Sequence, residues 1–316
     1  MRALITGITG FAGSHLAELL LEDDFEVFGT VRPRSKMENI EHIQDKVKLK
    51  SADIRDASSM LRVVKEVDPD CIFHLAAQSF VKESWDSPLE TLATNILGCA
   101  NLLEAVRQVG DGCVVQVAGS SEEYGMVEDD ELPIKETNPL RPLSPYGVSK
   151  VAQDLLSQQY AVSFDMNVLV TRAFNHTGPR RGEVFATSNF AKQIALIEAG
   201  KREAVIRHGN LGAVRDFTDV RDTVRAYLLV AESGESSEVY NICTGQGYEI
   251  GTMLHMLIDL SSHKITLEED PDRLRPSDVP QLVGNCDRIR ALGWAPTIPF
   301  EKTLKDLLDY WRMRVR

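Results

Sequence analysis

The chain has 316 residues, of which 43% are hydrophobic and 26% charged, proportions that suit an ordinary globular protein. Its net charge of −12 argues against nucleic acid or an anionic membrane as a general partner, but leaves room for a local basic pocket. The five cysteines are dispersed and show no metal-ligand spacing, so we expect a reducing compartment and no metal site. The chain begins with a strand-like run and has no apolar stretch approaching membrane-spanning length. A cytoplasmic protein with no membrane partner is therefore expected.

Short apolar runs alternate with helical patterns through the first 170 residues or so. This alternation predicts an α/β fold with a doubly wound parallel sheet. Strands are expected at residues 2–6, 25–31, 47–49, 71–75, 114–118 and 167–172, and helices at 14–22, 57–67, 89–108 and 149–163.

After about residue 175 the alternation is looser. Helical patterns occur at 189–199, 248–260 and 300–311, and a strand pattern at 239–243. We expect a smaller C-terminal α/β lobe that is interleaved with the main sheet rather than a separate module.

Three glycines, Gly7, Gly10 and Gly13, lie between the first strand and the first helix, with Phe11 and Ala12 among them. Glycine permits a tight turn and a close backbone approach, and a helix N-terminus offers amide donors to a diphosphate. The alternative is a purely structural turn. The strand–turn–helix context favours a dinucleotide site of the Rossmann type.

The end of the second strand lacks the acid that usually binds the ribose 2′-hydroxyl of NAD. Arg32 follows instead, with Arg34 or Ser35 in reach to assist it. A guanidinium suits a 2′-phosphate, so NADP is favoured over NAD, although a solvated basic loop is the alternative.

Asp53 and Ile54 follow the third strand, where they can reach an adenine. A helix N-cap at Asp53 or Asp56 explains the same residues equally well.

Tyr146 and Lys150 are spaced four residues apart, which places both on one face of a helix. A nearby ammonium is expected to lower the pKa of the phenol, as a catalytic acid/base requires near neutral pH. One such pair alone is a weak signal, because chance supplies about 0.3 per chain of this composition.

Several motifs occur in order with these residues. They are Thr-Gly-x-x-Gly-x-x-Gly at 6–13, His-Leu-Ala-Ala at 74–77, Thr-Asn at 94–95, Gly-Ser-Ser-Glu-Glu-Tyr-Gly at 119–125 and Tyr-x-x-x-Lys at 146–150. Together they resemble the extended short-chain dehydrogenase/reductases over essentially the whole chain.

The resemblance implies a catalytic group of Ser120, Tyr146 and Lys150, with hydride passing between NADP(H) and a sugar carbon. It also implies that Leu75, Ala76 and Ala77 line the cofactor. Residues 1–174 would then bind NADP(H), and residues 175–316 would mainly bind substrate. Family members usually dimerise through two helices, here 89–108 and 149–163, so we expect a homodimer, with a tetramer as the alternative.

Glu122 raises a second possibility, because nucleotide-sugar 4,6-dehydratases resemble this pattern and use such a Glu to abstract the C5 proton of the sugar. Some reductases of the 4-keto product also resemble it, and a solvated or hydrogen-bonding Glu remains an alternative role.

The second half of the chain resembles the GDP-mannose branch, which holds GDP-mannose 4,6-dehydratases and GDP-4-keto-6-deoxy-mannose reductases. The carrying segments are 174–179, 209–222 and 274–280. The resemblance implies that Arg215 and Arg275 bind the diphosphate and ribose of a GDP-sugar, with Asp278 near the nucleotide. Further substrate contacts are expected from Ser79, Ser121, Asn175, His176, Asn189 and Asn210.

Features of both enzymes are present. Segments 81–85, 214–222 and 274–277 look like the reductases, whereas segment 179–183 and the loop at 32–35 look like the dehydratases. We favour the reductase, with the dehydratase or a bifunctional enzyme as the alternative. A 4-epimerase or a non-catalytic NADP-binding regulator is less favoured, because Ser120, Tyr146 and Lys150 are all present and no acid follows the second strand.

Overall fold

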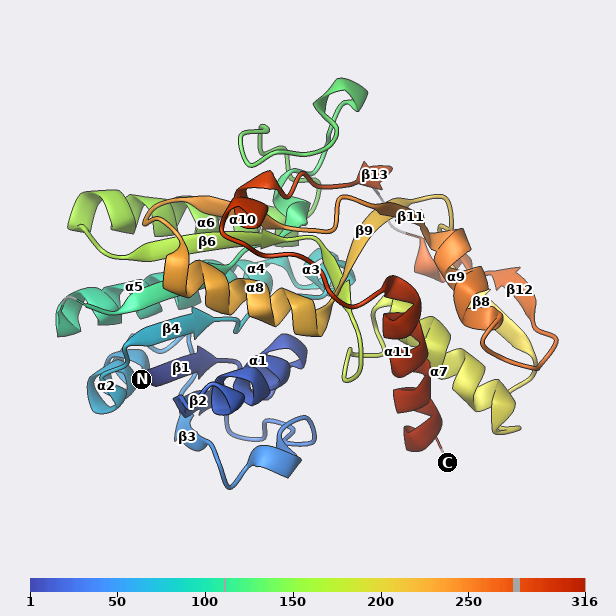
Figure 1. Ribbon diagram of the computed structural model, residues 1–316, viewed down its shortest axis with the longest axis horizontal. Coiled ribbons are helices and arrows are strands. Elements are labelled where there is room, and N and C mark those ends of the chain that lie inside the picture. The colour runs from blue at the N-terminus through green and yellow to red at the C-terminus, as the bar shows by residue number, and fades with distance from the viewer. Residues whose placement is uncertain (111, 275–278, 316) are drawn as a thin grey trace.

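The computed structural model describes residues 1–110, 112–274 and 279–315. Its centre is a seven-stranded sheet of parallel strands in the order β3-β2-β1-β4-β5-β6-β10 (Figure 1). Buried apolar residues stand side by side across it, and Leu4 of β1 lies between Phe28 of β2 and Ile72 of β4. The expected doubly wound α/β fold is confirmed. The strands are β1 (Arg2–Thr6), β2 (Glu26–Val31), β3 (Lys48–Ser51), β4 (Cys71–His74), β5 (Val114–Ala118), β6 (Val168–Ala173) and β10 (Val239–Ile242).

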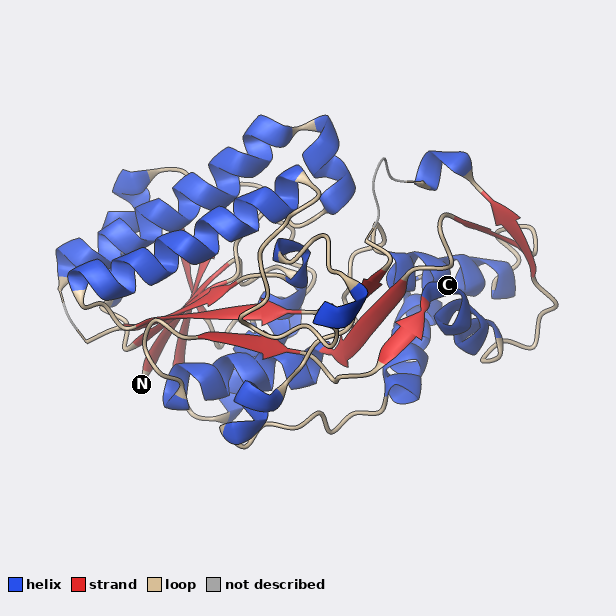
Figure 2. Cartoon of the chain, turned by 90° about the horizontal axis from the view of Figure 1, so that it is seen from above, coloured by secondary structure: helices blue, strands red, loops and turns tan. Residues whose placement is uncertain are grey.

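Helices cover both faces of this sheet, as Figure 2 shows from above. On one face α1 packs against α8, and on the other α2 packs against α5, and α5 against α6. Each face has its own buried apolar cluster, which is what a sheet covered on both sides requires. These helices are α1 (Phe11–Glu22), α2 (Ala57–Val67), α5 (Gly98–Val109), α6 (Pro145–Phe164) and α8 (Val220–Ser233).

A smaller lobe lies at one end of the sheet (Figure 1). Strand β9 (Val214–Asp219) pairs with β7 (Asn175–Thr177), β11 (Gly247–Glu249) and β13 (Gln281–Leu282), and β8 (Val205–His208) pairs with β12 (Thr266–Glu269). A third apolar cluster unites the helices of this lobe. They are α7 (Ala186–Glu198), α9 (Ile250–Ile258) and α11 (Phe300–Arg314).

Short helices connect these parts. They are α3 (Val81–Asp86), α4 (Pro88–Leu92), the π-helix η2 (Ala93–Leu97), α10 (Asp287–Ala291), and the 3₁₀ turns η1 (Glu41–Ile43), η3 (Ser121–Glu123), η4 (Asp129–Glu131) and η5 (Pro271–Arg273). The helix expected at 89–108 is therefore the succession α4, η2 and α5. Such π turns inside helices are frequent at functional sites.

Two further differences concern helix α6 and helix α8. Helix α6 begins at Pro145, not at residue 149, because Ser144 caps it by accepting from the Gly147 N–H. Helix α8 was not expected at all, although Val220, Val224, Tyr227 and Leu228 have helical spacing and are buried.

Strand β10 and helix α8 come from beyond residue 174, yet β10 pairs with β6 in the main sheet. The division of the chain into cofactor-binding and substrate-binding parts stays a prediction, because it concerns ligands. Within the described residues, no helix combines the length and the apolar character needed to cross a bilayer.

Candidate active site

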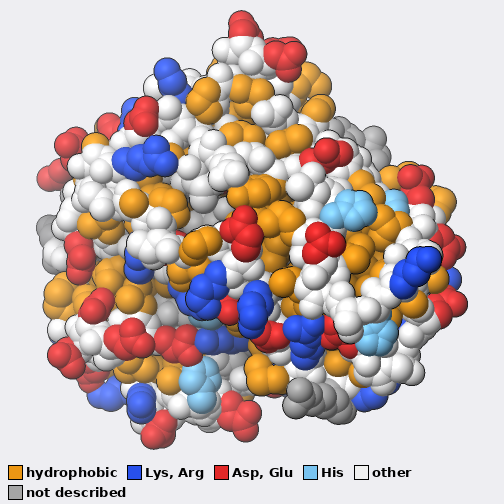
Figure 3. Space-filling view, turned by 45° about the vertical axis from the view of Figure 1, so that its right-hand side comes forward, with side chains coloured by type: hydrophobic (Ala, Val, Ile, Leu, Met, Phe, Trp, Pro, Cys, Tyr) orange, Lys and Arg blue, Asp and Glu red, His pale blue; other side chains and the backbone are white. Residues whose placement is uncertain are grey.

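A cleft of about 1300 Å³ opens where the carboxyl ends of the main strands face the lobe. That volume exceeds an ordinary small-molecule pocket and suits two nucleotides. Figure 3 shows Lys and Arg side chains gathered near the middle of one face, among acidic and hydrophobic ones. The site residues expected from the sequence that line the cleft are Gly7, Gly10, Phe11, Ala12, Gly13, Arg32, Asp53, Ile54, Leu75, Ala76, Ala77, Ser79, Ser120, Ser121, Glu122, Tyr146, Lys150, Asn175, His176, Asn189, Asn210 and Arg215.

The glycine turn brings β1 and α1 together at the floor of the cleft. Gly7 has a φ of +77°, and the Gly10 N–H donates to the Gly7 carbonyl at 2.9 Å. A Cβ on Gly7 would meet the Cα of Ala76 at 3.0 Å, so the turn lies directly against the end of β4. Helix α1 has no side-chain cap and no acid in its first turn. Its first amides and its positive dipole therefore face the cleft without a competing carboxylate.

The end of β2 presents Arg32 to the cleft. Ser35 accepts a hydrogen bond from the Arg32 N–H at 3.0 Å and also lines the cleft. Arg34 has a φ of +69° and is not among the lining residues. Of the two partners expected for Arg32, the geometry favours Ser35.

The segment after β3 was expected either to border an adenine or to cap a helix, and different residues of it fit these two roles. Asp56 caps α2 by accepting from the Ser58 N–H, whereas Asp53 lines the cleft and pairs with Arg55 at 2.8 Å. The hydrogen bonds from Arg55 hold the pKa of Asp53 below its usual value.

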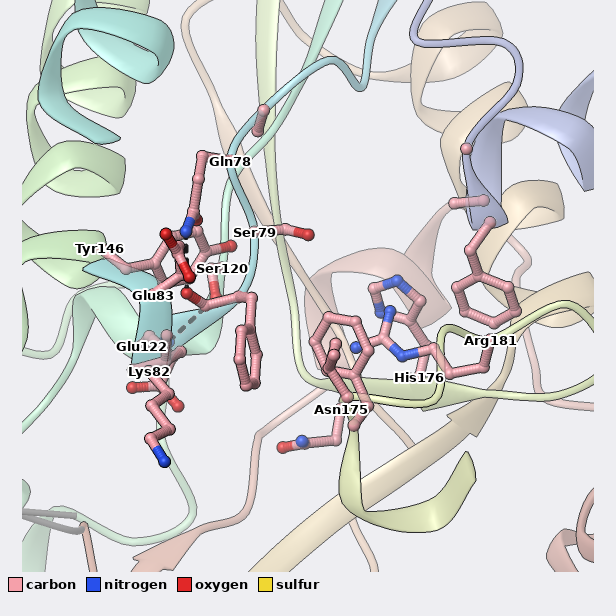
Figure 4. Close-up of a pocket in the computed structure, with 18 of the residues that line it drawn as sticks. Gln78, Ser79, Lys82, Glu83, Ser120, Glu122, Tyr146, Asn175, His176 and Arg181 are labelled. Carbon is pink, nitrogen blue, oxygen red and sulfur yellow. Dashed lines mark hydrogen bonds between the residues drawn. The ribbon is translucent and has the colours of Figure 1, made fainter. Parts of the chain in front are cut away.

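Ser120, Tyr146 and Lys150 lie together at the carboxyl end of β5, and Figure 4 shows Ser120 and Tyr146 on the same side of the opening as Glu122. Ser120 caps η3, because its hydroxyl accepts from the Glu122 N–H. A Cβ on Gly147 would meet the Glu122 carbonyl at 2.7 Å, so glycine allows α6 to approach this turn. The Lys150 Nζ lies 6.0 Å from the centre of the Tyr146 ring.

The pKa of Tyr146 differs from the expectation. Burial raises it above the usual value, and the hydrogen-bonded Ser120 hydroxyl only partly offsets this effect. The Lys150 ammonium is turned instead toward the Ala118 carbonyl at 2.7 Å and Gln153 Oε1 at 2.9 Å. Burial lowers the pKa of Lys150 to about 8. The phenol is thus protonated at neutral pH in this arrangement.

A buried charged cluster fixes the backbone of Ser120. Glu123 accepts from the Ser120 N–H at 2.6 Å, and Arg172 lies 3.2 Å from Glu123 and 2.7 Å from Asp154. Burial and the charge of Asp154 raise the pKa of Glu123 well above its usual value. Two carboxyl groups share one guanidinium, so Glu123 retains its proton more readily than an exposed Glu would.

The opposite wall carries Asn175, His176 and Arg181 (Figure 4). His176 Nδ1 lies 3.1 Å from the Phe174 carbonyl, so it carries the proton and Nε2 remains an acceptor. Burial and Arg181 lower the pKa of His176 to about 3. The ring stacks on Phe11 with centroids 5.8 Å apart.

Arg181 was not expected from the sequence to be a site residue, yet it lines the cleft. Its guanidinium lies 3.5 Å from the centre of the Phe185 ring and 5.0 Å from that of Phe11. Burial lowers its pKa to about 10, so it remains charged at neutral pH. In the part of the chain that the structure describes, it forms no ion pair. A cation so placed can bind an anionic group in the cleft. The resemblance of segment 179–183 to the dehydratases was the sequence feature that could have identified Arg181 as a site residue.

At the lobe, the side chain of Asn189 is already engaged: its Oδ1 accepts from Arg273 at 2.9 Å and its Nδ2 donates to the Glu183 carbonyl. Arg215 is buried and donates to the Val214 carbonyl. Arg273 also lines the cleft, as does Lys82, which donates to the Asp272 carbonyl at 2.8 Å. Neither was expected. The expected Arg275 and Asp278 lie outside the described residues.

No group of three or more His, Cys, Asp and Glu residues within the described ranges could hold a metal ion.

The family model described as GDP-mannose 4,6 dehydratase matches residues 4–307. Relatives include a GDP-6-deoxy-D-mannose reductase of Pseudomonas aeruginosa, 32% identical over all of this chain and 98% of that protein. The GDP-mannose 4,6 dehydratase 2 of Arabidopsis thaliana is 35% identical over 97% of this chain and 86% of that protein.

Two solved structures share the fold. RMD from Pseudomonas aeruginosa, complexed with NADPH, has a TM-score of 0.85 and 30% identity over 99% of each chain. A UDP-glucose 4-epimerase of Thermotoga maritima with UDP-glucose has a TM-score of 0.89 and 29% identity over all of both chains. The resemblance to extended short-chain dehydrogenase/reductases is confirmed, and this chain belongs to the GDP-mannose 4,6 dehydratase family within them.

Proposed function

We propose that this protein is an NADP(H)-dependent enzyme that reduces the C4 ketone of GDP-4-keto-6-deoxy-mannose to a GDP-6-deoxy-hexose. One observation carries the proposal: Ser120, Tyr146 and Lys150 line the same cleft as the glycine turn and Arg32. The full-length similarity to a GDP-6-deoxy-D-mannose reductase supports the choice of reaction.

The cleft fits NADP(H) at one end. The uncapped start of α1 suits the diphosphate, and Arg32 with Ser35 suits a 2′-phosphate that no carboxylate at the end of β2 would repel. Asp53 and Ile54 would border the adenine, and Leu75, Ala76 and Ala77 the middle of the cofactor. Arg181, between two aromatic rings, would bind an anionic group of the cofactor or substrate. When bound, NADPH supplies the hydride for C4.

The chain's own residues handle the proton. Because burial raises the pKa of Tyr146, its phenol is protonated at neutral pH and can donate to the C4 oxygen as that oxygen gains negative charge. Ser120 would hydrogen-bond the same oxygen and orient it. The charge on Lys150, which lines the cleft beside Tyr146, would stabilise the phenolate that remains.

The substrate would occupy the other end, where Asn210, Arg215 and Arg273 line the cleft. Planar guanidinium groups suit a diphosphate. Ser79, Ser121, Asn175, His176 and Asn189 are the proposed neighbours of the sugar and nucleotide, and Arg275 and Asp278 stay predictions.

Glu122 favours a second function, GDP-mannose 4,6-dehydration. It lines the cleft, and its negative charge raises the pKa of Tyr146. A carboxylate this close to the catalytic phenol can serve as the base for the C5 proton.

One experiment separates the two. The protein is incubated with GDP-mannose alone, and then NADPH and GDP-4-keto-6-deoxy-mannose are supplied, with products followed by NMR. The reductase consumes NADPH with the ketone and leaves GDP-mannose untouched. A 4-keto product from GDP-mannose alone, without net cofactor change, would contradict a reductase-only assignment.

The Glu122→Gln variant tests the base. It should abolish any dehydration and leave ketone reduction largely intact, whereas Tyr146→Phe should strongly slow both reactions. Equal loss of both reactions in Glu122→Gln would exclude the C5-base role.

We also infer a homodimer, with a tetramer as the alternative. Val148, Leu155 and Val162 repeat every seven residues along α6 and are 46%, 54% and 76% exposed. Leu89 and Leu97 are 80% and 58% exposed on the neighbouring segment. An exposed apolar stripe on two helices suits packing against a second copy, and sedimentation analysis would measure it.

The working compartment is proposed to be the cytoplasm, with no nucleic acid or membrane as partner. All five cysteines are free thiols, which suits a reducing compartment, and the net charge of −12 disfavours binding to nucleic acid or to an anionic membrane.

A further inference from the structure

The ammonium of Lys150 is held by two acceptors. Lys150 is only 4% exposed, and its Nζ donates to the Ala118 carbonyl at 2.7 Å and to Gln153 Oε1 at 2.9 Å. An ammonium has three N–H donors, so one remains for the cleft that Lys150 lines. The Ala118 acceptor is a backbone carbonyl, which any residue at that position would supply. The Gln153 acceptor is a side-chain oxygen, which an apolar residue at position 153 would not supply.

Gln153 serves no evident packing purpose as an amide. It is 1% exposed, and its Nε2 has no oxygen or nitrogen partner within the described residues; it faces the Cys99 thiol, a weak acceptor. Leaving a buried N–H group unpaired costs about 1–3 kcal/mol, so an apolar residue would suit this face of α6 better for folding alone. The Oε1 must face Lys150, because an ammonium can only donate.

Among the described residues, no negatively charged group is hydrogen-bonded to the ammonium. Glu123 on η3 and Cys99 on α5 act on it through space, and burial raises the pKa of both groups, which favours their neutral forms. On α6 itself, burial raises the pKa of the Tyr146 phenol.

His74, at the end of β4, is neutral too, because burial lowers its pKa to about 3. The Thr6 hydroxyl accepts from the Leu75 and Ala76 N–H groups and so donates to His74 Nδ1. His74 Nε2 therefore carries the ring proton and offers Lys150 no acceptor. The positive charge of Lys150 is therefore stabilised by the neutral carbonyl groups of Ala118 and Gln153.

We propose that Gln153 is a positioning residue, whose carbonyl oxygen keeps the Lys150 ammonium charged and directs its remaining N–H toward the cleft. The proposal rests on the proposed role of Lys150 in the reaction. Because burial lowers the pKa of Lys150 to about 8, the loss of one acceptor brings its titration close to neutral pH.

The test is a titration of the free protein, labelled with ¹³C at lysine Cε and followed by NMR, with the Lys150 signal identified by its loss in Lys150→Met. In Gln153→Leu the midpoint should move to lower pH by about one pH unit. In Gln153→Glu it should move to higher pH, because the acceptor then carries charge. Gln193→Leu is the matched control: Gln193 is also a buried glutamine, but it lies on α7 and bonds the backbone of Arg207 instead of Lys150, so its loss should leave the midpoint unchanged.

Midpoints that shift in opposite directions in Gln153→Leu and Gln153→Glu support the proposal. A merely structural role for Gln153 would not shift the Lys150 midpoint down in one variant and up in the other. Midpoints within about 0.2 pH unit of the wild type, or shifts of the same sign, would overturn it. If Gln153→Leu fails to fold, Gln153→Glu and the control decide. The titration uses no substrate, so failure to reduce any GDP-sugar would refute the proposed function while leaving this result in place.

Discussion

The two ends of the cleft are built in different ways. At the catalytic end, Ser120, Tyr146 and Lys150 are 9%, 7% and 4% exposed and are held by β5, η3 and α6 of the main sheet. At the lobe end, Arg273 has a side chain 36% exposed and is held by Asp270 and Asn189, which lie on different segments. Burial shifts pKa values at the first end, whereas Arg273 at the second end offers a solvent-exposed charge beside the buried Arg215. We therefore expect the catalytic end to set the rate and the lobe end to set affinity.

The largest effect should follow Tyr146→Phe, which removes the proton donor and keeps the ring. We expect kcat for ketone reduction to fall by about 10²–10⁴-fold, the usual contribution of a general acid, with NADPH affinity nearly unchanged. Tyr160→Phe is the control, since Tyr160 lies on the same helix but bonds Glu104 away from the cleft. A loss below about tenfold would show that Tyr146 is not the acid.

The buried histidines predict acid sensitivity. Burial lowers the pKa of His15 to about 4 and those of His74 and His176 to about 3, below the usual histidine value of 6.5. Below that value the unfolded chain binds protons that the folded chain does not, so the free energy of unfolding falls as pH falls. As the pH falls from about 7.5 to about 5.5, each of these histidines should lower the free energy of unfolding by about 1 kcal/mol.

Urea unfolding at the two pH values measures this. His15→Gln should reduce the pH dependence by about a third, whichever way it changes stability at high pH. His263→Gln, at an exposed position, should leave the difference as it is in the wild type. Equal stability at both pH values would contradict the neutral, buried state of these rings.

At the cofactor end, Arg32→Gln should weaken NADPH binding by about 10–100-fold, the loss of a charge-assisted contact, and change NADH binding little. Fluorescence titration with each cofactor measures the ratio. Arg34→Gln is a matched control two residues along, because Arg34 does not line the cleft. Parallel losses for NADPH and NADH would place Arg32 away from the 2′-phosphate.

Arg34 also shows where the sequence stops being informative. The pattern of residues 2–31 predicted β1, α1 and β2 well, and the limits of α2 at Ala57–Val67 were predicted in full, because local periodicity and an Asp cap define them. Which of Arg34 and Ser35 assists Arg32 depends on a left-handed turn at Arg34, which spacing alone does not reveal.

The lobe was less predictable for a related reason. Strand β9 pairs with β13, more than 60 residues later, so its short strands depend on distant partners rather than on local pattern. The catalytic pair shows a second limit. Its spacing predicted that Tyr146 and Lys150 are neighbours, but not that burial raises the pKa of the phenol above its usual value.

The smallest effect is expected at the lobe end. Arg273→Gln should raise KM for the GDP-sugar by about 3–10-fold and leave kcat unchanged, because an exposed guanidinium shared with Asp270 contributes only about 1 kcal/mol to binding. Arg207→Gln is the control, since Arg207 is similarly exposed, pairs with Glu268 and does not line the cleft. Steady-state kinetics with both variants makes the comparison. A fall in kcat with unchanged KM would mean that the lobe end also shapes the transition state, and that the two ends do not divide rate and affinity between them.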